Sequence, residues 1–230
     1  MFYEVHNRPL PVLICKLDQG ESVQCQKGAM SWMTPSISMQ TGLGSGKGGV
    51  LGKMAKSIFT GESIFRNTYT ATSGPGEIAF ASSFPGDIIS FDIGKTKLIA
   101  QKSAYFASTP GVEMEVAFTG TKKVGGIFGG EGLIMQRFTG NGTVFLEIDG
   151  CVYTYELGAG ESMLIDTGYL AAMEETVTMD VEAIKGVGNI LAGGEGLFNT
   201  KVTGPGKIWL QTMPTIALAG AIRPYIPTSN

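Results

Sequence analysis

Two short patterns recur three times along the chain, in the same order and at nearly constant spacing. The first is a turn centred on a glycine, found at Gly20, Gly94 and Gly160. The second places a glycine and a glutamate ahead of apolar residues, with the acids at Glu62, Glu131 and Glu195. The glycines are 74 and 66 residues apart, and the glutamates 69 and 64. A repeat of this period is typical of chains built from similar supersecondary units, so the sequence predicts three such units.

Each unit is predicted to consist of short strands between tight turns. A glycine-bracketed turn closes the second pattern in every copy, at 74–76, 140–142 and 204–206, and an alternating apolar stretch follows it. Glycine supplies 34 of the 230 residues, and turns that need a positive φ explain most of this excess. We therefore predict one all-β domain over 1–230, with three tandem repeats at about 12–86, 87–150 and 151–226 around a pseudo-threefold axis. The tyrosine and phenylalanine side chains follow the strand alternation and are expected in the core.

Charge is sparse and uneven along the chain. The net charge is −3 and only 16 % of the residues are charged. General nucleic-acid binders carry a basic excess, so we expect no DNA binding and consider RNA binding unlikely on this ground. Residues 1–86 carry a net charge of +2 and residues 151–230 a net charge of −4. Opposite charges of this kind favour head-to-tail association between copies.

The residues that most enzymes and metal sites need are scarce. His6 is the single histidine, whereas zinc and non-haem iron sites usually need two or three imidazoles. The cysteines match no metal-binding spacing and are predicted to be buried thiols in a reducing compartment: Cys15, Cys25 and Cys151. We predict no enzymatic activity, no catalytic or metal site and no cofactor.

The glycine-rich stretch 41–49 is similar to a phosphate-binding loop but departs from its pattern. Lys47 is followed by glycine rather than by serine or threonine. A G-x-G-x-x-G match at Gly44, Gly46 and Gly49 marks a dinucleotide site only inside a βαβ unit. The first copy also has about seven more residues here than the third. We therefore interpret the stretch as a surface insertion.

This insertion is basic and amphipathic, and it is the predicted interaction surface. Its residues are Lys47, Leu51, Lys53, Met54, Lys56 and Phe59. Such a segment suits contact with a second copy, with another protein or with an anionic membrane surface, and the alternative is a solvated loop. The repeat-equivalent acids Glu62, Glu131 and Glu195 either face one another across the axis or stabilise turns and pair with lysines.

The glycine motifs resemble those of one known family. The Gly130–Leu133 stretch with Phe138–Gly142, and the copy Gly194–Leu197 with Thr203–Gly206, are similar to the Altered Inheritance of Mitochondria twenty-four family over about Val12 to Ile226. That resemblance implies a double-stranded β-helix in three tandem repeats, similar to the tryptophan RNA-binding attenuation protein. Fungal members of the family are mitochondrial and linked to inner-membrane organisation. The family offers no catalytic residues to carry over.

Together these patterns favour a non-enzymatic scaffold or interaction module that forms homo-oligomers. The alternatives are a small-molecule-binding module with a pocket between repeats and, less favoured, an RNA-binding protein. Neither a leader peptide nor an apolar run of about 18 residues is found, so we expect a cytoplasmic, prokaryotic protein.

Overall fold

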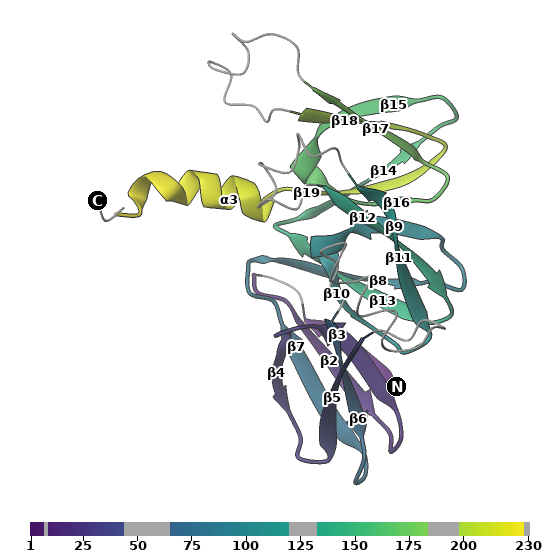
Figure 1. Cartoon of the computed structure of the whole chain (residues 1–230), viewed down its shortest axis with the longest axis vertical. Coiled ribbons are helices and arrows are strands. Elements are labelled where there is room, and N and C mark those ends of the chain that lie inside the picture. The colour runs from purple at the N-terminus through teal and green to yellow at the C-terminus, as the bar shows by residue number, and fades with distance from the viewer. Residues whose placement is uncertain (7–8, 44–64, 120–132, 184–197, 228–230) are drawn as a thin grey trace. The chain divides into compact units, whose positions relative to one another are not determined.

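In the computed structural model, residues 1–6, 9–43, 65–119, 133–183 and 198–227 are described, and they form antiparallel sheets with little helix (Figure 1). The prediction of an all-β chain is confirmed in this coarse sense. The described part of the chain divides into two compact units, each with its own sheets and its own core.

The first unit comprises Met1–Lys95, Tyr105–Glu113 and Thr139–Glu147. Its smaller sheet has the strand order β1 (Phe2–His6), β2 (Val12–Leu17), β7 (Gly76–Ala81) and β4 (Met30–Met33). Its larger sheet has the order β5 (Ile37–Leu43), β6 (Phe65–Ala71), β3 (Ser22–Gln26), β10 (Tyr105–Ser108), β13 (Thr143–Asp149) and β8 (Gly86–Asp92). Alternating side chains from these strands, among them Leu13, Phe80 and Phe106, form one buried cluster.

The second unit comprises Thr96–Ala104, Met114–Phe138 and Ile148–Asn230. Its larger sheet has the order β11 (Val112–Thr119), β12 (Ile134–Gly140), β9 (Leu98–Gln101), β16 (Leu170–Glu174), β19 (Gly206–Gln211) and β14 (Val152–Leu157). A smaller sheet contains β15 (Ser162–Asp166), β18 (Phe198–Thr203) and β17 (Thr178–Ala183), in that order. Its buried cluster includes Met135, Val202 and Ile208.

Both six-stranded sheets contain a pairing between strands about 70–85 residues apart in sequence, and we call these two pairings the internal junctions. In one, β3 pairs with β10, so that Cys25 lies opposite Ala107 and Gln24 opposite Ser108. In the other, β9 pairs with β16, so that Ala100 lies opposite Ala172 and Ile99 opposite Met173. The two junctions therefore share one antiparallel geometry.

The predicted glycine turns form, with one variation. Gly20 and Gly160 have φ values of 88° and 78°, a region open to glycine because it lacks a Cβ. The N–H of Gly20 donates to the carbonyl of Ala71 at 2.8 Å, and that of Gly160 to the carbonyl of Gly204 at 3.3 Å. The N–H of Gly94 donates instead to the Asp92 carboxylate at 3.0 Å. The middle turn is therefore built differently from the other two.

Strand alternation and turn spacing leave two features unpredicted. Helix α3 (Thr215–Ile222) and the short 3₁₀ helix η3 (Arg223–Tyr225) follow β19, and none of their residues is buried (Figure 1). In addition, Tyr153 and Tyr155 on β14 are exposed. The expectation that tyrosine and phenylalanine side chains lie in the core is wrong at these two positions and also at Phe2, Phe84 and Tyr225, which are exposed. Tyr153 and Tyr155 lie on the edge strand of their sheet, whose outward face is solvated.

Candidate functional site

The predicted interaction surface and the repeat acids lie outside the described residues. This holds for Lys47, Leu51, Lys53, Met54, Lys56 and Phe59, and for Glu62, Glu131 and Glu195. Their roles stay predictions. The described residues present two other candidate surfaces, one strand edge in each compact unit.

The first of these edges belongs to β4. Strand β4 pairs with β7 with a register shift between Met30 and Trp32. The same kind of shift occurs where β10 pairs with β13 and where β16 pairs with β19. Unlike β10 and β16, β4 ends its sheet within the described part of the chain. Its outer edge therefore presents unpaired backbone groups, as edge strands do.

The second edge belongs to β15. Strand β15 pairs with β18, with Ile165 opposite Thr200. This matches the pairing of Cys25 on β3 with Asn67 and of Ala100 on β9 with Gln136. Strands β3 and β9 each have a further neighbour at an internal junction, whereas β15 ends its sheet among the described residues. We refer to the outer edges of β4 and β15 as the open edges.

Large apolar side chains are exposed at both open edges. Leu164 on β15 is 63 % exposed, and Trp32 and Met33 on β4 are 49 % and 37 % exposed. At the internal junctions, the residues in the corresponding registers are between 0 % and 7 % exposed. Burying apolar surface is the main favourable term in protein association, so these exposed side chains make the open edges candidate interaction surfaces.

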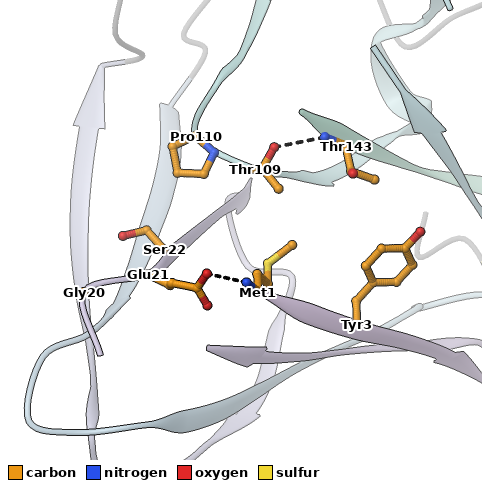
Figure 2. A pocket seen from close by; sticks show the side chains of 8 residues that line it. All are labelled: Met1, Tyr3, Gly20, Glu21, Ser22, Thr109, Pro110 and Thr143. Atoms are coloured by element: carbon orange, nitrogen blue, oxygen red, sulfur yellow. Dashed lines mark hydrogen bonds and ion pairs between the residues drawn. The ribbon is translucent and has the colours of Figure 1, made fainter. Parts of the chain in front are cut away.

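A hollow of about 480 Å³ with a mixed polar and apolar lining lies elsewhere in the first unit (Figure 2). It is lined by Met1, Tyr3, Gly20, Glu21, Ser22, Thr109, Pro110 and Thr143. The Met1 ammonium group pairs with the Glu21 carboxylate, which also accepts the Asp18 N–H at 2.9 Å. These two hydrogen bonds lower the pKa of the Glu21 carboxyl. The hydroxyl of Thr109 accepts the Thr143 N–H at 3.0 Å. The hollow thus offers hydroxyl and carboxylate groups suited to a polar molecule.

The buried titratable groups of the first unit have structural roles. Burial raises the pKa of Cys15 to about 12 and that of Cys25 to about 12, with repulsion from Cys25 adding to the effect at Cys15. Both thiols are therefore protonated at neutral pH and poor nucleophiles. The buried Arg66 guanidinium donates to Gln24 Oε1 at 3.1 Å and to the Val112 carbonyl at 3.5 Å. These contacts link β6 to β3 and β11.

Two other kinds of site are absent from the described residues. No group of three His, Cys, Asp or Glu side chains there is arranged to hold a metal ion. In the same residues, no helix is both long and apolar enough to span a bilayer.

Comparison with known proteins identifies the family. The model of the family described as "Mitochondrial biogenesis AIM24" matches residues 3–213. The chain belongs to this AIM24 family. It is 29 % identical over 224 residues to the uncharacterized protein M6_Spy0233 of Streptococcus pyogenes serotype M6, covering 96 % of this chain and 88 % of that protein.

A solved structure extends the likeness to the fold. It is the crystal structure of protein SPYM3_0169 from Streptococcus pyogenes, with a TM-score of 0.79 and 25 % identity. The match covers 98 % of this chain and 99 % of that one. The resemblance to the AIM24 family inferred from the glycine motifs is thus confirmed over nearly the whole chain.

Proposed function

We propose that this chain is a non-enzymatic, cytoplasmic bacterial protein that acts as a scaffold by pairing head to tail with further copies of itself. The observation that carries the proposal is the contrast between the buried internal junctions and the exposed apolar residues of the open edges. Both relatives named above come from a bacterium, which supports the bacterial assignment.

The proposal treats residues 12–86, 87–150 and 151–226 as three repeats of a double-stranded β-helix-like unit. In support, each stretch contains six strands in the described residues, and its first strand pairs with its sixth, as β2 does with β7 and β14 with β19. In this scheme, the second strand of one repeat pairs with the third strand of the next at each internal junction. The second strand of the last repeat is β15 and the third strand of the first repeat is β4. We propose that these two strands pair between two copies rather than within one chain.

The internal junctions supply the register that we expect for that pair. By analogy with Cys25 opposite Ala107, Ile165 of one copy lies opposite Trp32 of the next, and Leu164 lies opposite Met33. Full burial of one such side chain contributes about 1.5–3 kcal/mol. Since each of the three exposed side chains is already partly buried, together they contribute on the order of 3 kcal/mol, besides new backbone hydrogen bonds.

An interface between two different edges is heterologous, so it builds rings if the rotation closes and open chains if it does not. The net charges of +2 for residues 1–86 and −4 for residues 151–230 favour encounters in this orientation. Charge attraction is screened by salt, so it steers the encounter, while the apolar contacts hold the pair.

Two blocked variants test the proposal. The β4-blocked variant carries Trp32→Lys and Met33→Lys, and the β15-blocked variant carries Leu164→Lys. Each retains one open edge, so each alone is expected to be monomeric in analytical ultracentrifugation, and an equal mixture is expected to form a dimer. Tyr153→Lys is the matched control, because Tyr153 is equally exposed on an edge strand but lies outside the proposed pairing.

Wild-type and Tyr153→Lys proteins are expected to associate further as concentration rises from about 1 to about 100 µM, a range that corresponds to modest binding energies. Three results would each refute head-to-tail pairing. They are wild-type protein that remains monomeric, blocked variants that assemble as wild type does, and a mixture of the blocked variants that remains monomeric.

The hollow beside Met1 supports a second candidate function, the binding of a small polar molecule. Its lining comes from Met1 and Tyr3, which precede the first proposed repeat, from 20–22 of that repeat and from 109–143 of the second, which fits a pocket between repeats. Native mass spectrometry of gently purified protein tests it. A stoichiometric adduct that is lost in Thr109→Trp, a substitution that fills the hollow, supports binding, and the absence of any adduct contradicts it.

A further inference from the structure

Helix α3 is apolar on every side, and the described part of the chain leaves none of its residues buried. Between Lys207 and Arg223 the sequence contains no charged residue, and the helix itself reads Thr-Ile-Ala-Leu-Ala-Gly-Ala-Ile. None of these residues is buried, and Ile216, Ile222, Tyr225 and Ile226 are among the exposed large side chains of the chain. Helices that are apolar all round are normally buried.

The helix is anchored at its first turn alone. The Asp149 carboxylate accepts the N–H of Thr215 at 2.8 Å and its hydroxyl at 2.6 Å, which caps the helix. A Cβ built at Gly168 would lie 3.5 Å from Pro214 and 3.6 Å from Ile216. Gly168 belongs to η2 (Thr167–Tyr169), the 3₁₀ turn that directly follows β15. The helix therefore starts beside the end of the β15 open edge.

An isolated helix of eight residues is not stable in water, because its few hydrogen bonds do not offset the cost of nucleation. Capping by Asp149 adds about 1 kcal/mol, which is too little to change this. The remaining stabilisation has to come from a surface that covers the apolar side chains.

The chain topology indicates where that surface lies. After β7, the chain turns at 82–85 and continues as β8, which pairs with β13 of the next proposed repeat. After β13, it turns again and continues as β14, which pairs with β19 of the following repeat. After β19, the turn at 212–214 leads into α3 instead. In both earlier cases the segment after the turn lies in the next proposed repeat. In head-to-tail pairing, the repeat that follows the third one belongs to a second copy.

We infer that α3 docks on a second copy of this chain, beside strand β1 of that copy. In the first proposed repeat, the place beside β7 is taken by β2, and β1 forms the outer edge of that sheet. Exposed Phe2 on β1 and exposed Leu10 after it supply an apolar surface there. This inference rests on the proposed head-to-tail pairing, and it adds a second contact at the same interface.

The dimer of the two blocked variants tests the inference. The β4-blocked chain pairs through its own β15, so its α3 lies at the interface, whereas α3 of the β15-blocked chain does not. Labelling one chain with ¹⁵N allows hydrogen exchange to be measured separately for the two helices. On mixing, amide exchange in residues 215–222 of the β4-blocked chain is expected to slow at least about tenfold, and exchange in the other helix to stay fast.

Substitutions supply an independent readout. Ile222→Asp in the β4-blocked chain is expected to weaken the dimer about tenfold, and the same change in the β15-blocked chain to have no effect. Phe2→Ser is expected to weaken the dimer only when it is placed in the β15-blocked chain.

The outcomes separate the two proposals. A dimer in which both helices exchange at the monomer rate, or in which Ile222→Asp has no effect in either chain, overturns the docking of α3 and leaves strand pairing standing. No dimer at all overturns both. Protection of α3 by vesicles containing anionic phospholipid, without protection on mixing the chains, assigns the helix to a lipid surface and overturns the inference.

Discussion

Replacing Phe80 by alanine is expected to destabilise the first compact unit strongly. The ring is fully buried on β7 and packs edge-to-face against Tyr69 and Phe106, with centroid distances of 6.1 and 6.3 Å. Phenylalanine-to-alanine changes at such sites cost about 3–5 kcal/mol, because the lost apolar burial is combined with a residual cavity. The close packing of two further rings leaves little freedom for the site to collapse, which favours the upper half of that range.

The two tryptophans allow this loss to be assigned to a unit. Trp32 lies on β4 in the first unit and Trp209 on β19 in the second. In a Trp209→Phe background, urea unfolding followed by Trp32 emission should show a midpoint lower by about 2 M, for a slope of about 2 kcal/mol per M. Phe84→Ala is the control, since Phe84 is partly exposed, and it should change stability by less than about 1 kcal/mol. A Phe80→Ala midpoint within about 0.5 M of the parent would refute the packing argument.

Three further changes test other parts of the structure. Burial raises the pKa values of Cys15 and Cys25 to about 12. The free energy of unfolding should therefore stay constant below about pH 9 and fall as pH rises towards 12, because the unfolded chain then loses thiol protons first. Urea unfolding across this range should show a shallower fall for Cys15→Val. Asp149→Ala should cost α3 about 1 kcal/mol, seen as faster amide exchange in 215–222 with the urea midpoint of the strands unchanged. Gly206→Val should destabilise the second unit by about 1–3 kcal/mol, since φ is +142° and a Cβ would lie 2.6 Å from the Thr176 hydroxyl; a thermal midpoint equal to that of wild type would contradict this.

Local patterns in the sequence predict the strands and turns well, because hairpins are set by residues close together in the chain. The alternation after each glycine-bracketed turn corresponds to β7, β13 and β19. Equal distance from the turn glycines, however, makes Met33 the counterpart of Ala107. The strand registers make Trp32 its counterpart instead, because Trp32 lies opposite Ala79 on β7 and Ala107 lies opposite Phe145 on β13. The middle turn, between Asp92 and Leu98, is longer than its counterparts, and such an insertion cannot be located without the pairing.

The open edges and α3 could not be predicted from the sequence, for a different reason. Exposure of Trp32 and Leu164 depends on which strands lack a neighbour, a property of the sheet order rather than of any local pattern. One residue type does indicate the β4 open edge: β4 has a tryptophan at the register position where β10 and β16 have alanine. Helix α3 has no polar face, so it shows none of the periodicity by which amphipathic helices are identified.

The pairing of β3 with β10 has a consequence for synthesis of the chain on the ribosome. The first unit is not continuous in sequence, because it needs Tyr105–Glu113 and Thr139–Glu147 in addition to Met1–Lys95. Until residue 108 has left the exit tunnel, β3 has no β10 beside it, and until residue 147 has left it, β10 has no β13 beside it. Apolar strand edges therefore stay accessible to other nascent chains. Chains that stall before this point are therefore the ones that need a chaperone, and arrest after residue 147 should leave a first unit that resists proteolysis.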